Sequence, residues 1–291
     1  MNMASVLSVR GLSVNYSDYR AIDCLNFDIE AGHLVMLVGE SGSGKSTLIR
    51  SVLGLLGDDG DIVQGKILFD GMQLPIKNEK EMRAIRGKHI SIILQNPDRF
   101  LDPLLSIETQ YHEALSVHST THRKESRLRA MELFQQLGFS SPQDVLRKRP
   151  FELSGGMCQR AAIAIAMANT PRLLLADEPT SALDVATQKE VMELLKSIQK
   201  KRGTTILLVT HNMSIVSRYA DEVGIMYHGH LVEWGDCKEV LNDPRHTYTQ
   251  MLLDAVPHLD GGIPNVWHPI REVLSIGSKM QYISEHHCYL G

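Results

Sequence analysis

The chain contains 291 residues, of which 43% are hydrophobic and 22% are charged, and its formal net charge is −4. This length can form one large domain or two modest ones around a buried core. The slight acidity and the aromatic content of 5% disfavour nucleic-acid binding through a basic surface or through base-stacking platforms.

The four cysteines are scattered along the chain, and none belongs to a C-x-x-C pair. A zinc ribbon or a disulfide framework is therefore not expected, and a reducing cytoplasm fits this pattern best. No segment approaches the roughly 18 consecutive apolar residues that span a bilayer, and the first ten residues lack the features of a signal peptide. We therefore expect any membrane role to depend on a partner protein.

The N-terminal part of the chain has the character of β-structure. Residues 6–9 and 12–16 form two short β-like runs. Apolar residues then alternate with polar ones at a period of two, which is typical of a half-buried strand; they are Leu25, Phe27 and Ile29.

A change of pattern follows at residue 34. Leu34–Val38 is a continuous apolar run, as a buried parallel strand requires. A glycine-rich loop comes next, and then a helix that we expect to end at Gly57.

Three more apolar runs, at residues 90–94, 173–176 and 206–209, are separated by helical patterns. Strands that alternate with helices predict an α/β core with a mostly parallel sheet. Residues 109–149 are polar and lack strand runs, which predicts a small helical insertion. From about His246 we expect a tail without a regular pattern.

The glycine-rich loop at residues 39–46, which we call the phosphate loop, matches the motif G-x-x-x-x-G-K-[ST] in full. Its glycines allow backbone N–H groups to surround phosphate oxygens, and the following helix N-terminus adds partial positive charge. Lys45 would reach the β- and γ-phosphates, and the Ser46 hydroxyl would bind Mg²⁺. A chance match in a flexible Gly/Ser turn is the alternative, expected about once per hundred chains of this length, and the flanking strand and helix disfavour it.

Two adjacent carboxylates follow the apolar run at 173–176. Asp177 suits the coordination shell of Mg²⁺, and Glu178 is placed to polarise an attacking water. Alone, such a pair is often only a solvated turn. Its position between the phosphate loop and a second strand, which ends in Thr210 and His211, favours the functional interpretation.

The segment Leu153-Ser154-Gly155-Gly156, which we call the signature loop, is a candidate for a second phosphate site. Ser154 is expected to cap a helix, and the amides of Gly155 and Gly156 would point at anionic oxygen. An ordinary capped helix is the alternative. Together with the phosphate loop and the carboxylate pair, this segment resembles the L-S-G-G signature of the ABC ATPases.

That resemblance, which covers about residues 5–235, implies a fold and a domain organisation. The fold would be an α/β P-loop NTPase core with a mostly parallel sheet, an N-terminal antiparallel β-subdomain and an inserted helical subdomain. We expect an ATPase domain over residues 1–245, with the helical subdomain at about 96–153, and a C-terminal extension over 246–291.

The resemblance also implies an ATP-hydrolysing site with ATP and Mg²⁺ as its cofactors. Tyr16 stands at the place of the aromatic residue that stacks on adenine, Gln95 at that of the glutamine that reaches Mg²⁺ and water, and His211 at that of the histidine that contacts the γ-phosphate. The expected catalytic residues are Lys45, Gln95, Glu178 and His211, and the expected metal ligands are Ser46, Gln95 and Asp177. The expected nucleotide-binding residues are Tyr16, Gly39, Glu40, Ser41, Gly42, Ser43, Gly44, Lys45, Ser46, Thr47, Ser154, Gly155 and Gly156.

Within that family the chain resembles the peptide and nickel importers. The resemblance rests on Gln95-Asn96-Pro97 with Leu101-Asp102-Pro103, on Met157 after the signature loop, and on residues 244–249 and 252–257, where Thr247 replaces the usual proline. It implies an importer for peptides or for nickel or its metallophore complexes. An ABC exporter subunit is an alternative, which the C-terminal extension disfavours. A soluble family member acting on DNA or the ribosome is disfavoured because the chain shows neither heptads nor duplication.

The C-terminus carries histidines and one cysteine, and His286-His287-Cys288 resembles the ending of this group. The cysteine-rich segment of many members is missing, so no iron–sulfur cluster is expected. A metal site that also uses His258 and His268 is a hypothesis, and a solvated tail is the more common alternative.

The expected partners follow from the resemblance. Two ATPase subunits would pair head to tail, so that the signature loop of each faces ATP bound to the other, and the second subunit is expected to be a different chain. Permease subunits and, indirectly, an extracellular or periplasmic solute-binding protein would complete a transporter, with this chain at the cytoplasmic face of the membrane. No nucleic-acid partner is expected.

Overall fold

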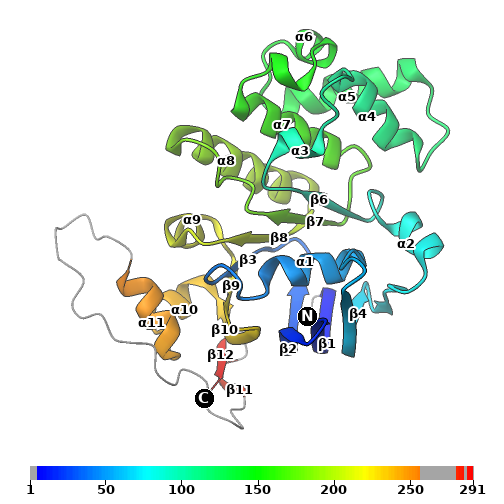
Figure 1. The fold of residues 1–291 in the computed structure, drawn as a ribbon. Coiled ribbons are helices and arrows are strands. Elements are labelled where there is room, and N and C mark those ends of the chain that lie inside the picture. The colour runs from blue at the N-terminus through cyan, green and yellow to red at the C-terminus, as the bar shows by residue number, and fades with distance from the viewer. Residues whose placement is uncertain (1–4, 256–279, 285–286, 291) are drawn as a thin grey trace. The chain divides into compact units, whose positions relative to one another are not determined.

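The computed structural model describes residues 5–255, 280–284 and 287–290. Contacts within the chain divide it into two compact units. The first unit comprises Met1–Leu74 and Val209–Gly291, and the second comprises Pro75–Leu208. Figure 1 labels most of the helices and strands of both.

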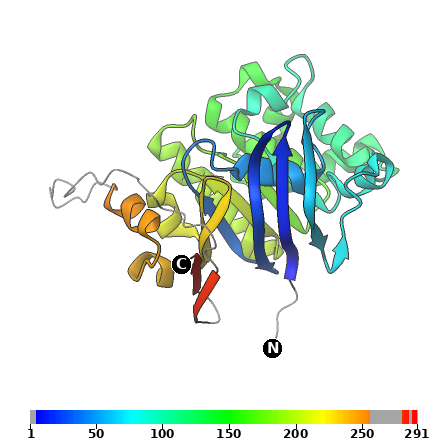
Figure 2. The same cartoon turned by 60° about the horizontal axis from the view of Figure 1, so that its bottom comes forward.

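An antiparallel sheet in the first unit has the strand order β2-β1-β4-β5 (Figure 2). Its strands are β1 (Ser5–Tyr16), β2 (Tyr19–Glu30), β4 (Gly60–Phe69) and β5 (Met72–Gln73). The two runs expected at 6–9 and 12–16 form the single strand β1, whose register shifts around Gly11. Gly11 has a positive φ of 56°, which lets the strand bend without ending. This sheet confirms the predicted antiparallel β-subdomain.

The other strands of the first unit follow one another in the order β11-β12-β10-β9-β3. They are β3 (Leu34–Val38), β9 (Glu222–Tyr227), β10 (His230–Asp236), β11 (Met280–Ser284) and β12 (His287–Leu290). β3 and β9 are parallel, whereas β10 is antiparallel to both β9 and β12. All five residues of β3 are buried, as its uninterrupted apolar sequence predicts.

Three short helices follow β8 (Thr205–Thr210) in the first unit, namely α9 (Met213–Tyr219), α10 (Cys237–Asn242) and α11 (Thr247–Asp254). The expectation of a tail without regular structure from His246 was therefore wrong for the described residues. α11 is capped by the His246 side chain, a residue type that is not among the usual N-caps. β12 pairs with β11 and with the distant strand β10, and local sequence does not reveal the second pairing.

The helix after the phosphate loop, α1 (Lys45–Leu53), ends earlier than predicted. Gly54 terminates it in the left-handed conformation with φ 62°, and its N–H bonds the carbonyls of Arg50 and Ser51. Gly57 was the expected end, but Gly54 already satisfies the requirements of a C-terminal cap.

The second unit places the parallel strands β6 (Ile90–Ile93) and β7 (Leu173–Asp177) side by side, with β8 next to β7 in the strand order. Its helices are α2 (Glu79–Ile85), α3 (Pro97–Phe100), α4 (Ile107–Ser116), α5 (Arg123–Gln136), α6 (Pro142–Arg147), α7 (Gly155–Ala166), α8 (Val185–Arg202) and the 3-10 turn η1 (Pro150–Glu152).

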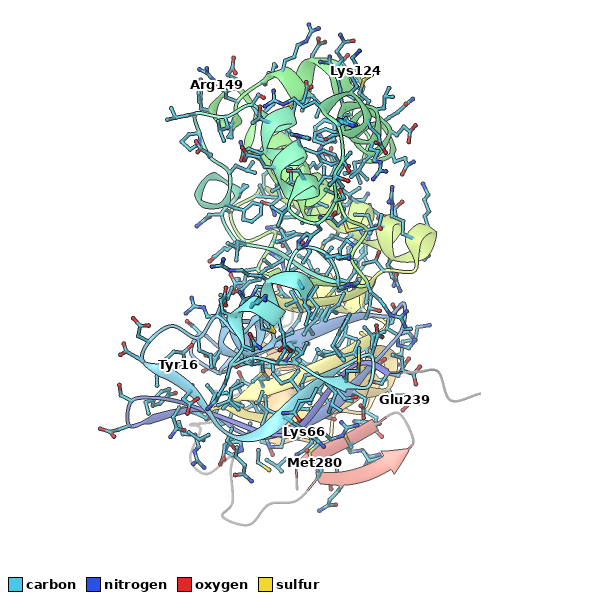
Figure 3. All side chains as sticks on the ribbon, turned by 90° about the vertical axis from the view of Figure 1, so that its right-hand side faces the viewer. Tyr16, Lys66, Lys124, Arg149, Glu239 and Met280 are labelled. Atoms are coloured by element: carbon cyan, nitrogen blue, oxygen red, sulfur yellow. The ribbon has the colours of Figure 1, made fainter. Side chains whose placement is uncertain are left out.

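The helices α4, α5 and α6 confirm the predicted helical insertion. Their core contains Tyr111, Phe134 and Phe139, and the rings of the last two stack with centroids 5.0 Å apart. Figure 3 labels Lys124 and Arg149 in this helical region. Together with the parallel strands and the antiparallel β-subdomain, these helices confirm the predicted fold class. The exact domain boundaries, at about 96, 153 and 245, remain predictions.

No helix within the described ranges combines the length and the apolar character needed to cross a membrane.

Candidate functional site

The phosphate loop joins β3 to α1 in the first unit, and its path depends on glycine. A Cβ atom at Gly39 would lie 2.1 Å from the Met226 carbonyl oxygen, and one at Gly44 would lie 2.6 Å from the carbonyl oxygen of Ala21. Gly44 also has φ 99°, in the left-handed region that favours glycine. The loop is thus held against the backbone of its neighbours at both ends.

The Lys45 side chain lies over this loop. Its Nζ donates hydrogen bonds to the carbonyl oxygens of Gly39, at 2.8 Å, and Glu40, at 2.7 Å, and to Ser43 Oγ at 3.1 Å. The whole residue is only 6% exposed. These three oxygens all belong to the phosphate loop, so the ammonium group is held directly over it.

The start of α1 supplies the other half of an anion site. Gly44 precedes the helix and has no side chain that could cap its first N–H groups. Ser46 and Thr47 lie in this first turn and are half-buried, while Ser41 and Gly42 are exposed. A helix N-terminus beside a buried lysine is an arrangement that binds phosphate groups.

Two other predicted residues also belong to the first unit. Tyr16 lies at the end of β1 (Figure 3) and is half-buried. Its phenol oxygen is buried and makes no hydrogen bond within the described residues. His211 directly follows β8 and is exposed. The next residue, Asn212, fixes the chain at this point because its side chain accepts hydrogen bonds from the N–H groups of Ser214 and Ile215.

In the second unit the structure brings Gln95 to the predicted catalytic carboxylate. Gln95 Nε2 donates to Glu178 Oε2 at 3.3 Å and to Ser181 Oγ at 3.0 Å. Ser181 Oγ in turn donates to the Glu178 carbonyl oxygen at 3.2 Å. Three residues from two separate loops therefore form one cluster, beside Asp177 at the end of β7.

Glu178 has an unusual backbone. Its φ of 46° lies in the left-handed region, which a residue with a Cβ rarely adopts. Strain of this kind persists where surrounding contacts enforce it, and it is concentrated at functional positions. The hydrogen bond from Ser181 Oγ to the Glu178 carbonyl oxygen acts on this backbone directly.

The loop after Glu178 is fixed by contacts that sequence reasoning missed. Gln188 Nε2 donates to the carbonyl oxygens of Thr180 and Leu183. Asp184 caps α8, and the hydrogen bond from the Thr187 hydroxyl, followed by backbone N–H groups, holds the pKa of its carboxyl below the usual value. The spacing of Asp184 and Thr187 is a recognisable capping signal, whereas the reach of Gln188 is visible only in the structure.

The signature loop stands at the N-terminus of α7. Ser154 caps this helix, as predicted, by accepting a hydrogen bond from the Met157 N–H at 3.3 Å. Gly155 is exposed, and no described atom lies within 4 Å of the place that its Cβ would take. A Cβ at Gly156 would instead lie 2.5 Å from Thr187 Cγ2. One glycine thus packs against α8, and the other leaves the helix end accessible.

The C-terminal histidines and cysteine do not form a metal site in the described part of the chain, where no group of three potential ligands is found. His287 Nε2 is instead 2.7 Å from Glu233 Oε1, in a pair that is almost fully buried. Burial raises the pKa of the Cys288 thiol to about 11. His258, His268 and His286 lie outside the described residues.

Comparison with protein families gives two matches. Residues 22–181 match the ABC transporter family. Residues 232–280 match the C-terminal region of oligopeptide and dipeptide transporters.

Curated relatives cover most of the chain. An oligopeptide transport ATP-binding protein of Bacillus subtilis is 40% identical over 89% of this chain and 74% of its own length. A dipeptide transport ATP-binding protein of Escherichia coli is 40% identical over 87% and 79%. A peptidoglycan transport ATP-binding protein of Agrobacterium fabrum is 42% identical over 93% of this chain, which spans only about half (53%) of that relative's length.

Solved structures agree with these matches. The cbiO1 protein of Clostridium perfringens, part of an ABC transporter complex, has a TM-score of 0.73 and 31% identity, with 82% of this chain and 92% of that one covered. A dimeric ATP-binding cassette with bound ADP and Pi has a TM-score of 0.69 and 27% identity, with 79% and 98% covered. The fold is therefore shared with ATP-binding cassettes of ABC transporters.

Proposed function

Since this chain belongs to the ABC transporter family as an ATP-hydrolysing subunit, we propose that it energises the import of short peptides through a membrane permease. The observation that carries the substrate class is the match of residues 232–280 to the C-terminal region of oligopeptide and dipeptide transporters. Relatives named for oligopeptide and dipeptide transport, at 40% identity, favour peptides over nickel or a metallophore. The same C-terminal match disfavours an exporter.

In this proposal the phosphate loop holds the β- and γ-phosphates of ATP. Lys45 exchanges its contacts with the loop carbonyls for phosphate oxygens, which gain charge-assisted hydrogen bonds. The first N–H groups of α1, whose N-cap residue Gly44 makes no side-chain hydrogen bond, bind the same anion. The half-buried ring of Tyr16 supports the adenine base.

The predicted metal ligands fit Mg²⁺, which prefers oxygen donors. Ser46 offers a hydroxyl, Asp177 a carboxylate and Gln95 an amide oxygen. The Gln95 amide nitrogen is the atom that bonds Glu178 and Ser181, and its oxygen accepts no hydrogen bond within the described residues. When bound, Mg²⁺ would supply positive charge against the phosphate oxygens.

Hydrolysis is assigned to Glu178 and its neighbours. Glu178 orients the attacking water and takes up its proton, while Gln95 holds this carboxylate through the bond from Nε2. His211 contacts the γ-phosphate. The hydrogen bond from Gln95 restrains the carboxylate before ATP arrives, which lowers the reorganisation needed for reaction.

A second ATPase subunit would complete the machinery. The exposed Ser154 and Gly155 are proposed to bind ATP held by that partner, expected to be a different chain. Exposed apolar side chains near α3, at Phe100 (37%) and Leu104 (74%), are suited to contact a permease helix at the cytoplasmic face of the membrane. A solute-binding protein on the other side would select the peptide.

Uptake by intact cells tests this proposal. Cells with the native chain are compared with cells carrying Glu178→Gln and, as a control, Glu190→Gln, which makes the same charge change at an exposed position on α8. We expect Glu178→Gln alone to stop uptake of labelled di- and tripeptides. Loss of labelled Ni²⁺ uptake instead would favour the nickel branch. Unchanged uptake of both would contradict an importer and favour the exporter alternative.

A further inference from the structure

Helix α11 contacts the phosphate loop from a point 208 residues further along the chain. The backbone N–H of Glu40 donates a hydrogen bond to the Tyr248 hydroxyl oxygen at 3.1 Å. Tyr248 is 1% exposed, although Glu40 itself lies at the surface. A buried side chain therefore holds one peptide group of an otherwise accessible loop.

The start of α11 is itself held firmly. His246 caps the helix, and its Nδ1 accepts the N–H of Tyr248 at 3.1 Å. The carboxylate of Glu233, on β10, accepts the N–H groups of Arg245 at 2.9 Å and of His246 at 3.1 Å. Glu233 is fully buried and also contacts His287 on β12. These contacts provide partners for both oxygens of the buried carboxyl group, which would otherwise be costly to bury, so the position of Tyr248 is set by β10.

The first two loop residues are flanked by two different elements. Met226 on β9 places its carbonyl oxygen so close to Gly39 that no Cβ would fit there. The neighbouring ring of Tyr227 packs against Tyr248 with centroids 4.3 Å apart. β9 and α11, which lie in the same unit (Figure 1), together fix Gly39 and Glu40.

The peptide groups on both sides of Glu40 Cα are engaged. Its N–H bonds Tyr248, and its carbonyl oxygen accepts the Lys45 ammonium at 2.7 Å. A rotation of Glu40 would therefore move an oxygen that positions Lys45. Burial raises the pKa of the Tyr248 phenol to about 12, so the hydroxyl stays neutral throughout the physiological range of pH.

We propose that Tyr248 is a positioning residue of the nucleotide site, through which helix α11 sets the affinity of the phosphate loop for ATP. Tyr248 touches neither phosphate nor metal in this account; it acts through Glu40 and Lys45. The inference rests on the proposed role of residues 39–46 as the phosphate site.

The test uses Tyr248→Phe in the full chain, which removes one oxygen atom. Tyr227→Phe is the matched control, because the Tyr227 hydroxyl makes no hydrogen bond to the loop in the described residues. We expect Tyr248→Phe to weaken Mg-ATP binding by about five-fold, the ratio that follows from loss of one neutral hydrogen bond. The KM for ATP should rise by a similar ratio while kcat at saturating ATP stays nearly unchanged.

Amide hydrogen exchange gives a readout that needs no nucleotide. In the native chain the Glu40 amide should be protected in spite of its exposed position, and Tyr248→Phe should remove this protection whereas Tyr227→Phe should not. An unprotected Glu40 amide in the native chain would overturn the inference even if Tyr248→Phe failed to fold.

Lys45→Ala, measured in parallel, distinguishes a failure of the phosphate-loop assignment from a failure of the positioning role of Tyr248. If Lys45→Ala abolishes ATP binding but Tyr248→Phe binds ATP as tightly as the native chain, the phosphate site stands and the positioning role of Tyr248 is refuted. If Lys45→Ala also binds ATP normally, the assignment of the phosphate loop fails, and the inference about Tyr248 fails with it.

Discussion

The phosphate loop and the signature loop both contain serine and glycine before a helix, but their surroundings differ. In the phosphate loop, Lys45 is 6% exposed and bonds three oxygens of its own loop, and the N-cap residue Gly44 makes no side-chain hydrogen bond. In the signature loop, Ser154 caps its own helix and Gly155 faces open space. The contacts of the phosphate loop come from its own chain, whereas the signature loop presents an accessible helix end. This contrast is what a site completed by another subunit requires.

Lys45→Ala, in the phosphate loop, should have the largest effect on ATP binding. Removing the ammonium deletes charge-assisted hydrogen bonds to phosphate, so ATP binding should weaken by about a hundred-fold or more. Titration with a fluorescent ATP analogue measures this directly. Lys124→Ala, at an exposed position of the helical insertion, is the control, and it should bind ATP as the native chain does.

Ser154→Arg, in the signature loop, should leave ATP binding unchanged and lower ATP turnover instead. The isolated chain should keep its affinity for ATP, because the signature loop is proposed to act on the nucleotide of the partner. ATP turnover of the assembled transporter should fall by on the order of a hundred-fold, as when donors to a developing charge are lost. Ser140→Arg, also exposed, serves as the control. A complex that carries Ser154→Arg and retains full turnover would argue against a shared site.

A pair of glycine substitutions sharpens the contrast in stability. Gly44→Ala forces a Cβ to within 2.6 Å of the Ala21 oxygen at a positive φ, and should lower the free energy of unfolding by about 2 kcal/mol or more. Gly155→Ala meets no neighbour and should change it by less than about 0.5 kcal/mol. Chemical denaturation of both variants checks this, and equal destabilisation would remove the distinction between the loops.

The smallest predicted effect is a pH dependence of stability that arises at His33, just before the strand that leads into the phosphate loop. His33, just before β3, contacts Glu222, and this hydrogen bond is the main cause that raises the pKa of His33 above its usual value. The stabilisation is therefore complete below about pH 6.5 and is lost as pH rises through the higher pKa of the folded state. Since His33 is partly exposed, the loss should stay below about 1 kcal/mol.

Melting curves between pH 5 and 9 test this prediction. The native chain should lose part of its stability across that window, and His33→Gln should flatten the dependence. A variant with the same pH profile as the native chain would show that another group is responsible.

Sequence patterns predicted the features that depend on local chemistry. The apolar run of β3, the glycine-dependent loop and the cap at Ser154 each follow from a few neighbouring residues. They also placed Gln95 and Glu178 at strand ends, which is where the structure joins them. The role of Glu178 followed from a carboxylate at a strand end after a phosphate loop, whereas the role of Gln95 came from the family resemblance.

The features that escaped prediction depend on contacts between distant parts of the chain. β12 is a strand because it pairs with β10, and His287 meets Glu233 across 54 residues. The contact of Tyr248 with Glu40 spans 208 residues. These contacts leave no local pattern in the sequence, because His287 and Tyr248 would be equally acceptable in a solvated tail. The early end of α1 at Gly54 was a choice between two suitable glycines.

The assembled transporter with Glu178→Gln in this chain provides the most direct test of the account. ATP occupancy and ATP turnover are measured on the same sample. We predict that ATP binds with near-native affinity, because the phosphate loop is intact, while turnover falls by about a hundred- to ten-thousand-fold for want of the base. Turnover at the native rate with ATP bound would contradict the assignment of Glu178 and, with it, the proposed mechanism.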